Sequence, residues 1–308
     1  MRKIIFCIFI TVIGLITTNC QKSYTWYVEP EFKATWERII RESPPPQSFI
    51  EIKTWEGGII PKEPGFLIAF KPWLSQEKVS VYNRLPYTLE FQGARLLALD
   101  PWMVFRKHRE PGLSVNRAYS QAGGDGTLLI PGRESTIVEA WTARLVQERP
   151  GVFPSEDHVW QEAKNNLFSG NRFPRGAETY TWQDVFFRLL GNETAWVYAP
   201  LSVIRLYPNP RKSILEASAF PERVHDQEAI GQYSLQASLL WALPLGSEYE
   251  KEQLAQTYEW LKSPEIQTLI ANTLGWIPAN PYGTPFDPIS FVSHRHWLTA
   301  SYVYEINE

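Results

Sequence analysis

The chain has 308 residues, a formal net charge of −3 at pH 7 and a sequence pI near 6.0. This length corresponds to about two domains. Hydrophobic residues make up 44% of the chain and charged residues 20%, which is typical of a globular protein and excludes a disordered one. The charge excludes the basic field expected of a nucleic-acid-binding protein. The only two cysteines, Cys7 and Cys20, exclude a disulfide scaffold.

Residues 1–19 have the form of an export signal. A short basic start precedes the apolar run 4–16, which is too short for the roughly 20 residues that span a bilayer. Together with Cys20, the segment resembles a bacterial lipoprotein signal, in which this cysteine becomes the lipid-modified first residue of the mature chain. Thr17 and Asn19 depart from the usual pattern, so an ordinary cleaved signal is the alternative.

Cleavage after residue 19 leaves Cys20 as the only cysteine, and an odd thiol in an exported protein favours lipidation. We therefore expect an exported protein that is lipid-anchored to the cell membrane and faces the periplasm or the exterior.

The mature chain opens with alternating strand and helix patterns. Residues 24–28 and 49–55 are rich in β-branched and aromatic side chains and predict strands. Residues 31–42 carry an apolar stripe at helical spacing, and 65–70 form a third apolar run. The order strand, helix, strand predicts a βαβ unit with a parallel sheet. Only a short segment, 57–64, separates the second strand from the third.

The rest of the chain continues this mixture. Asp100-Pro101 separates two apolar segments, and the 123–126 glycine cluster predicts a turn, because it lacks the Lys-Ser/Thr of a phosphate loop. Ser263 and Gly275 are expected to cap the two ends of one helix. The remaining expectations are apolar segments at 94–99 and 102–105, helices at 135–147, 157–168, 181–190 (with Thr181 as N-cap and Gly191 after the end), 251–261 and 264–274, strands at 194–204 and 239–245, and a non-helical stretch at 276–281.

Three phrases in the C-terminal third resemble bacterial extracellular solute-binding proteins, family 1-like with the type II periplasmic binding fold, which are the binding lipoproteins of ABC importers. They are A-L-P-L-G-S (242–247), W-L-K-S-P-E-I-Q (260–267) and L-G-W-I-P-A-N-P (274–281). The segment 170–204 is similar to a further stretch of that family.

The resemblance implies an α/β fold with two periplasmic-binding-protein-like lobes and an interlobe ligand cleft, reduced in length. The implied division is a lipoprotein signal peptide at 1–19, lobe I at 24–93 plus 215–275, and lobe II at 94–214 plus 276–308.

Candidate ligand-binding residues follow from where strands end and lobes cross. In parallel α/β sheets the ligand crevice lies outside the carboxyl ends of the strands. Sugar binding uses flat aromatic faces together with planar polar groups, and the chain has 13 Trp. We therefore expect ligand contacts from Glu29, Trp55, Glu56, Trp73, Asp100, Trp102, Tyr198 and Trp276. Core packing is the alternative for each aromatic, and for Trp36, Trp182, Trp241 and Trp260 it is the preferred interpretation. Capping is the alternative for Glu29 and Glu56.

The resemblance implies a substrate-binding lipoprotein of an ABC transporter. Such a protein captures a small solute, here expected to be a sugar or oligosaccharide, between two lobes and delivers it to the permease. The implied partners are the solute, the transmembrane subunits of the permease and the membrane through lipid on Cys20, with no nucleic acid and no cofactor.

Two alternatives remain. One is a solute-binding-protein descendant without ligand that acts as a structural or interaction lipoprotein, and the weaker one is a secreted glycoside-active enzyme. We expect no enzyme, because no nucleophile elbow or Cys/His arrangement occurs. His294 and His296 are interpreted as a surface pair rather than as metal ligands.

Overall fold

A computed structural model of the chain describes residues 24–46, 49–70, 79–83, 90–91, 93–107, 128–147, 157–169, 173–191, 195–204, 215–218, 234–285, 287–300 and 302–306. The chain divides into two compact units. Unit 1 comprises Met1–Ile68 and Pro244–Trp260, and unit 2 comprises Ala69–Leu243 and Leu261–Glu308. The chain passes between them inside two strands and one helix. The lobe boundaries expected from the sequence stay a prediction.

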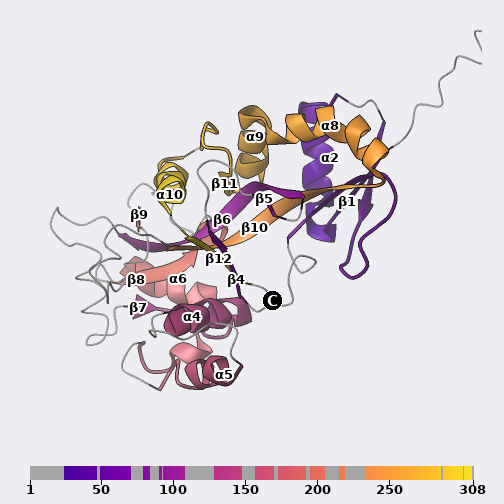
Figure 1. The fold of residues 1–308 in the computed structure, drawn as a ribbon. Helices are drawn as coiled ribbons and strands as arrows, with labels where there is room; N and C mark the ends of the chain where they lie inside the picture. The colour runs from indigo at the N-terminus through magenta and orange to yellow at the C-terminus, as the bar shows by residue number, and fades with distance from the viewer. Residues whose placement is uncertain are drawn as a thin grey trace, which may run out of the picture. The chain divides into compact units, whose positions relative to one another are not determined.

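Unit 1 is a three-stranded parallel sheet covered by two helices (Figure 1). β1 (Tyr24–Val28) lies between β2 (Ile50–Thr54) and β3 (Gly65–Ala69). The 3₁₀ turn η1 (Pro30–Phe32) and helix α2 (Lys33–Glu42) connect β1 to β2, which confirms the expected strand, helix, strand order. Helix α8 (Glu248–Lys262) supplies the second covering helix, after β10 (Ser234–Leu245) returns the chain.

The core of unit 1 is built around the indole ring of Trp26. This ring is fully buried and lies edge-on to Trp36 of α2 and to Phe66 of β3, with both centroid distances 5.7 Å. Trp260 of α8 lies 6.0 Å away, so both helices cover the face of β1 that carries Trp26. Strand alternation therefore turns Tyr27 toward the opposite face.

Unit 2 contains a mixed sheet. The unit 2 part of β10 pairs antiparallel with β6 (Ala94–Lys107), which pairs antiparallel with β8 (Trp196–Pro200), and β8 pairs parallel with β7 (Leu128–Leu129). Short strands join these neighbours: β5 (Glu90–Phe91), β9 (Leu215–Ser218) and β11 (Ile277–Pro278) pair with β6, while β12 (Tyr302–Ile306) pairs with β10 and β4 (Val79–Asn83).

Helices cover both sides of the unit 2 sheet. In Figure 1, α4 and α6 lie on one side, with α5 beyond them, and α9 and α10 lie on the other. The bounds are α4 (Ser135–Gln147), α5 (Asp157–Asn165), η2 (Ala177–Thr179), α6 (Trp182–Gly191), α7 (Leu201–Ile204), α9 (Pro264–Leu274) and α10 (Pro288–Thr299).

Three of the predicted caps are confirmed. The Ser263 hydroxyl accepts a hydrogen bond from the Ile266 amide at 3.3 Å, and Gly275 ends α9 in the left-handed conformation with φ 84°. At the start of α6, the Thr181 hydroxyl accepts from the Asp184 amide, and an Asp184 carboxylate oxygen accepts from the Thr181 amide. This reciprocal pair is a capping box.

Three expectations need correction. Asp100-Pro101 does not divide β6, because the strand changes partner there: residues up to Pro101 pair with β10, and Trp102 onward pairs with β8. Proline lacks an amide hydrogen, and this change of partner lets the strand accommodate it.

The strand predicted over 194–204 ends at Pro200, and α7 follows it. Gly191 is the last helical residue of α6 rather than the residue after it. Helix α10 was not predicted, and the 123–126 turn lies outside the described residues.

None of the helices in the described residues is long and apolar enough to span a bilayer.

Gly65 provides a test of the unit 1 sheet. A Cβ at this position would lie 1.8 Å from the Thr25 carbonyl oxygen, so Gly65→Ala must displace β3 from β1. We expect a loss of about 1–3 kcal/mol in the free energy of unfolding, measured by urea denaturation. Gly191→Ala is the matched control, because a Cβ there would meet no neighbouring atom within 4 Å. Equal unfolding midpoints for the two variants would contradict the described approach of β3 to β1.

Candidate functional site

The register of the unit 1 sheet aligns the carboxyl ends of its strands. Val28 pairs with Thr54 of β2 and with Ile68 of β3. Trp55 continues this pairing, because its amide donates a hydrogen bond to the Val28 carbonyl at 2.7 Å. Glu29 and Trp55, the residues that directly follow β1 and β2, therefore lie at the same edge of the sheet, which we call the carboxyl edge. This is the edge at which α/β proteins place ligands.

The side chains at this carboxyl edge differ in exposure. Glu29 is half-buried and precedes η1 without capping it through its side chain, so the capping alternative does not account for it. Trp55 is buried, and its Nε1 donates to the Ile59 carbonyl oxygen at 3.4 Å. Glu56 is exposed. The edge thus carries two acidic side chains, of which Glu56 is exposed, and one buried indole that holds its own loop.

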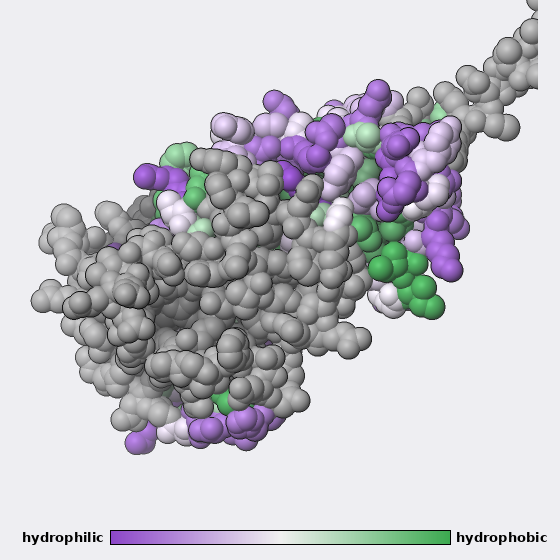
Figure 2. Space-filling view, in the orientation of Figure 1, coloured by the Kyte–Doolittle hydropathy of each residue, from purple (hydrophilic) through white to green (hydrophobic). Residues whose placement is uncertain are grey.

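The connection from β2 to β3 contains no helix. It spans residues 55–64 and leads from the carboxyl end of β2 back to the start of β3, with β1 lying between those strands. At its turn, Gly57 and Gly58 have φ of 91° and 87°, and Ile59 behind them is 87% exposed. Figure 2 shows an apolar patch over this loop, in the lower right of the view. An exposed apolar tip therefore lies beside the carboxyl-edge residues.

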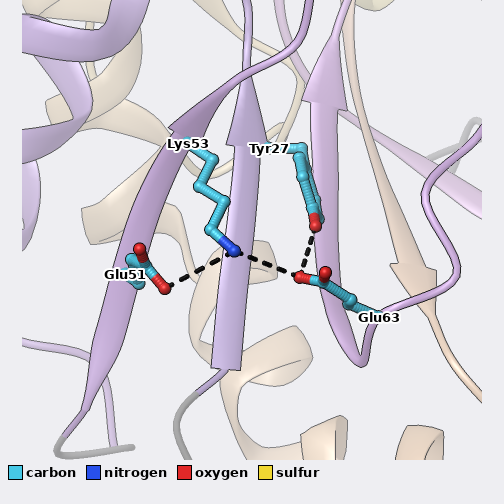
Figure 3. A network of polar contacts seen from close by, with 4 residues as sticks. All are labelled: Tyr27, Glu51, Lys53 and Glu63. Atoms are coloured by element: carbon cyan, nitrogen blue, oxygen red, sulfur yellow. Dashed lines mark hydrogen bonds and ion pairs between the residues drawn. The ribbon is translucent and has the colours of Figure 1, made fainter.

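A polar network joins the far end of this loop to the sheet (Figure 3). The Tyr27 hydroxyl donates to a Glu63 carboxylate oxygen at 2.5 Å, and Lys53 Nζ lies 3.3 Å from the same oxygen and 3.6 Å from Glu51. Tyr27 and Lys53 are register partners on β1 and β2. Sequence reasoning did not identify these four residues, although alternation with the buried Trp26 places Tyr27 on this face.

The network shifts the ionisation of its members. Burial, together with the hydrogen bond to Glu63, raises the pKa of Tyr27 to about 12. The hydrogen bonds from Tyr27 and Lys53 hold the pKa of Glu63 below its ordinary value, and the bond to Glu63 raises the pKa of Lys53. The network therefore favours a protonated Tyr27, a charged Lys53 and an ionised Glu63, and these are the forms that bond the loop to the sheet.

In unit 2, the structure brings together three of the predicted residues. Val104 of β6 pairs with Tyr198 of β8, and the Trp102 and Tyr198 ring centroids are 5.4 Å apart. The buried Asp100 accepts hydrogen bonds from the Ser202 amide, at 2.9 Å, and from the Ser202 hydroxyl. Tyr198 donates to the side-chain carbonyl of Gln236. All three predicted residues are buried, and they have partners inside the unit.

Gln236 and Gln267 are buried amides that sequence reasoning missed. Gln236 Nε2 donates to the Ala140 carbonyl at 3.2 Å, and Gln267 Oε1 accepts from the Asn280 amide at 2.7 Å. The sequence signal for such a residue is a glutamine within an apolar run, which indicates a buried amide that needs hydrogen-bond partners.

Trp276 follows the Gly275 cap and packs on an aromatic ring. Its amide donates to the Ala271 carbonyl at 2.7 Å, and its ring centroid lies 4.9 Å from that of Phe70, which directly follows β3. Both residues belong to unit 2. Trp73 lies outside the described residues. Ligand contacts from all eight predicted residues stay a prediction.

The interpretation of His294 as a surface residue is wrong. His294 is buried in α10, and its Nε2 lies 3.2 Å from the Asn280 carbonyl oxygen. Burial lowers the pKa of His296, with a smaller contribution from Arg295. Within the described ranges, no group of three or more His, Cys, Asp or Glu side chains is placed to hold a metal ion.

No protein-family model matches the chain, and no curated protein matches its sequence. Solved structures do match. The chain is similar to the bacterial solute receptor AcbH, described as having an exclusive substrate preference for β-D-galactopyranose, with a TM-score of 0.61 and 12% identity over 92% of this chain and 87% of the receptor. It is similar to the Bordetella ferric binding protein, with a TM-score of 0.56 and 12% identity over 90% of this chain and 95% of that one.

A eukaryotic thiaminase-I, solved with the thiamin analogue 3-deazathiamin, is also similar, with a TM-score of 0.58 and 10% identity over 93% of this chain and 94% of the enzyme. The same fold therefore carries both binding proteins and an enzyme. At these identities the comparisons show the fold alone. The chain has the mixed α/β fold of the two-lobe periplasmic solute-binding proteins.

The Tyr27 network makes a prediction about alkaline pH. Since the pKa of Tyr27 is about 12 in the folded chain against an ordinary 10.0, the unfolded chain loses this proton first as the pH rises. The contribution of Tyr27 to stability is therefore complete below about pH 10 and is lost between about pH 10 and 12. We expect Tyr27→Phe to flatten the fall of the urea midpoint in this range. Tyr282→Phe, at an exposed tyrosine, is the control and should keep the wild-type slope. Identical slopes for the two variants would disprove the link.

Proposed function

We propose that the chain is an exported solute-binding protein of an ABC importer, anchored to the membrane by lipid on Cys20. It captures a small solute between its two lobes and delivers the solute to the permease subunits without chemical change. Ligand stabilises the closed form through its higher affinity for that form, and this form docks on the permease.

The observation that supports this proposal most strongly is the fold, combined with the residues at the carboxyl edge of unit 1. Parallel strands end there together, and Glu29, Trp55 and Glu56 follow them. Carboxylates accept hydrogen bonds from solute hydroxyls in pairs, and an indole covers the apolar face of a pyranose ring. A sugar or oligosaccharide is therefore the proposed solute class. Asp100, Trp102, Tyr198 and Trp276 are the proposed contributions of unit 2, with Trp73 after β3.

A specific observation favours a second candidate. The side chains of Asp100, Trp102 and Tyr198 are buried, and the two polar ones have hydrogen-bond partners inside unit 2. If that packing is their whole role, the chain is a descendant of solute-binding proteins that has lost its ligand and acts as a surface interaction lipoprotein. Saturable binding of a solute separates the two candidates.

Solute binding is tested with the soluble fragment beginning at Gln21, by intrinsic Trp fluorescence and thermal unfolding against sugars, polyols, amines and ferric iron. A ligand at about 100 times its Kd should add roughly 2.7 kcal/mol to the free energy of unfolding, because it binds only the folded chain. We expect a saturable shift with one sugar class and no product. A panel without any shift would support the ligand-free candidate, and product formation would support an enzyme.

The carboxyl edge is tested with an exposed acid, so that folding is preserved. Glu56→Gln removes a charge that can accept from solute hydroxyls, and we expect it to raise the Kd for the solute by about tenfold, corresponding to a hydrogen bond to a charged group. Glu37→Gln, at an exposed position on α2, is the matched control and should bind as the unmodified chain does. Equal Kd values for both variants would remove Glu56 from the site.

A further inference from the structure

The amino ends of the unit 1 strands form a second edge, opposite the carboxyl edge. The Tyr24 amide donates to the Phe49 carbonyl at 3.1 Å, and the Thr25 amide donates to the Pro64 carbonyl at 3.2 Å. These contacts place the segments that precede β2 and β3 beside the start of β1. We call this set the amino edge.

Helix α8 begins at the same edge. The Tyr24 hydroxyl donates to Gln253 Oε1 at 3.1 Å, and a Cβ on Gly246 would lie 3.3 Å from Pro64 Cα. Figure 1 shows the starts of β1 and α8 at the same end of unit 1. Tyr249 lies one turn before Gln253, in the first turn of this helix.

Two aromatic side chains at the amino edge face solvent. Phe49 is 50% exposed and Tyr249 is 67% exposed. The segment that ends at Phe49, residues 43–49, reads S-P-P-P-Q-S-F and contains no charged residue. Nearby on α8, Glu248 lies 2.9 Å from Lys251, so these opposite charges offset each other. The first turn of α8 also carries Glu250, so the two exposed aromatic side chains are the apolar part of this edge.

A lipid on Cys20 would bring the bilayer surface close to this edge. Only four residue steps separate Cys20 from Tyr24, the first residue of β1. Each step spans at most about 3.6 Å, so the start of β1 stays within roughly 14 Å of the cysteine. A lipid on Cys20 holds that residue at the bilayer surface, and the start of β1 is held close to it.

We propose that the amino edge of unit 1 is a membrane-contact surface, with Phe49 and Tyr249 in the headgroup layer of the bilayer. This proposal rests on the proposed lipid anchor. Aromatic side chains favour the membrane–water interface, and one lipid signal gains strength from a second contact. Because aromatic rather than basic side chains make the contact, it is hydrophobic and insensitive to salt. It also turns the carboxyl edge, with Trp55 and Glu56, away from the membrane.

Single-cysteine labelling tests the proposal on the full lipid-modified chain. Lipidation blocks Cys20, so Phe49→Cys or Tyr249→Cys introduces the only free thiol for an environment-sensitive fluorophore. Ile59→Cys is the matched control, because Ile59 is 87% exposed in the same unit. It lies beside Trp55, about 20 Å along β2 from Phe49. Proteins are reconstituted in phosphatidylcholine vesicles that contain lipids with a nitroxide on the headgroup.

We expect quenching at positions 49 and 249 to be several times stronger than at position 59, with no loss at high salt. Equal quenching at the three positions, or the strongest quenching at position 59, would overturn the proposal.

A separate readout reports on the anchor. The unmutated chain should take up no fluorophore and should float with the vesicles, whereas Cys20→Ala should remain in the soluble fraction. Labelling of the unmutated chain without flotation would refute the anchor and the membrane contact together. Flotation without position-dependent quenching would refute the membrane contact alone.

Discussion

The parallel pairing of β1 with two neighbours is the constraint on which unit 1 depends. β1 is in register with β2 on one side and with β3 on the other, and glycine is the only residue type that fits at position 65 against the Thr25 carbonyl. This pairing sets both edges of the sheet at once. Three of the residues proposed for solute binding, Glu29, Trp55 and Glu56, follow the strands at one edge, and the exposed aromatics lie at the other. A shift of one residue in the register of β1 would move each of its side chains to the opposite face of the sheet.

The abundance of tryptophan has mainly a structural explanation in the described residues. Trp26 and Trp36 form the edge-to-face centre of unit 1, and Trp141 and Tyr198 form a similar contact in unit 2 with ring centroids 5.5 Å apart. Aromatic pairs of this geometry stabilise a core beyond the area they bury. Trp55 differs, because it is buried at a strand end and bonds the loop that carries the exposed Ile59. Its indole therefore stabilises the loop at the carboxyl edge.

The loop between β2 and β3 takes the place of a crossover helix in this sheet. Parallel sheets are usually covered on both faces by helices. Here the connection has no helix, and the face it crosses carries the polar side chains of Tyr27, Lys53 and Glu51 beside the buried Leu67 of β3. These polar side chains tolerate solvent, and Glu63 joins the loop to two of them. The helix-free loop thus preserves the strand order and is joined to the polar part of this face.

The sequence was sufficient to predict most elements and few contacts. Local signals such as the Ser263 cap, the Gly275 end and the β-branched and aromatic run of β1 depend on neighbouring residues, and these predictions are confirmed. The continuity of β6 could not be predicted, because it depends on a change of partner at Pro101 between two strands distant in the chain. The buried positions of His294 and Gln236 likewise depend on long-range packing. For the candidate site, the sequence predicted that Glu29 and Trp55 follow strand ends, whereas their alignment at one edge and the Tyr27 network required the structure.

Mass spectrometry under non-denaturing conditions tests the central claim most directly. The mature chain would be mixed with the solute panel, desalted gently and weighed. The account predicts one adduct per chain, whose released solute has an unchanged mass and belongs to a single sugar class. A chain that carries no adduct from any solute, or that releases a chemically altered one, would contradict solute capture as its function.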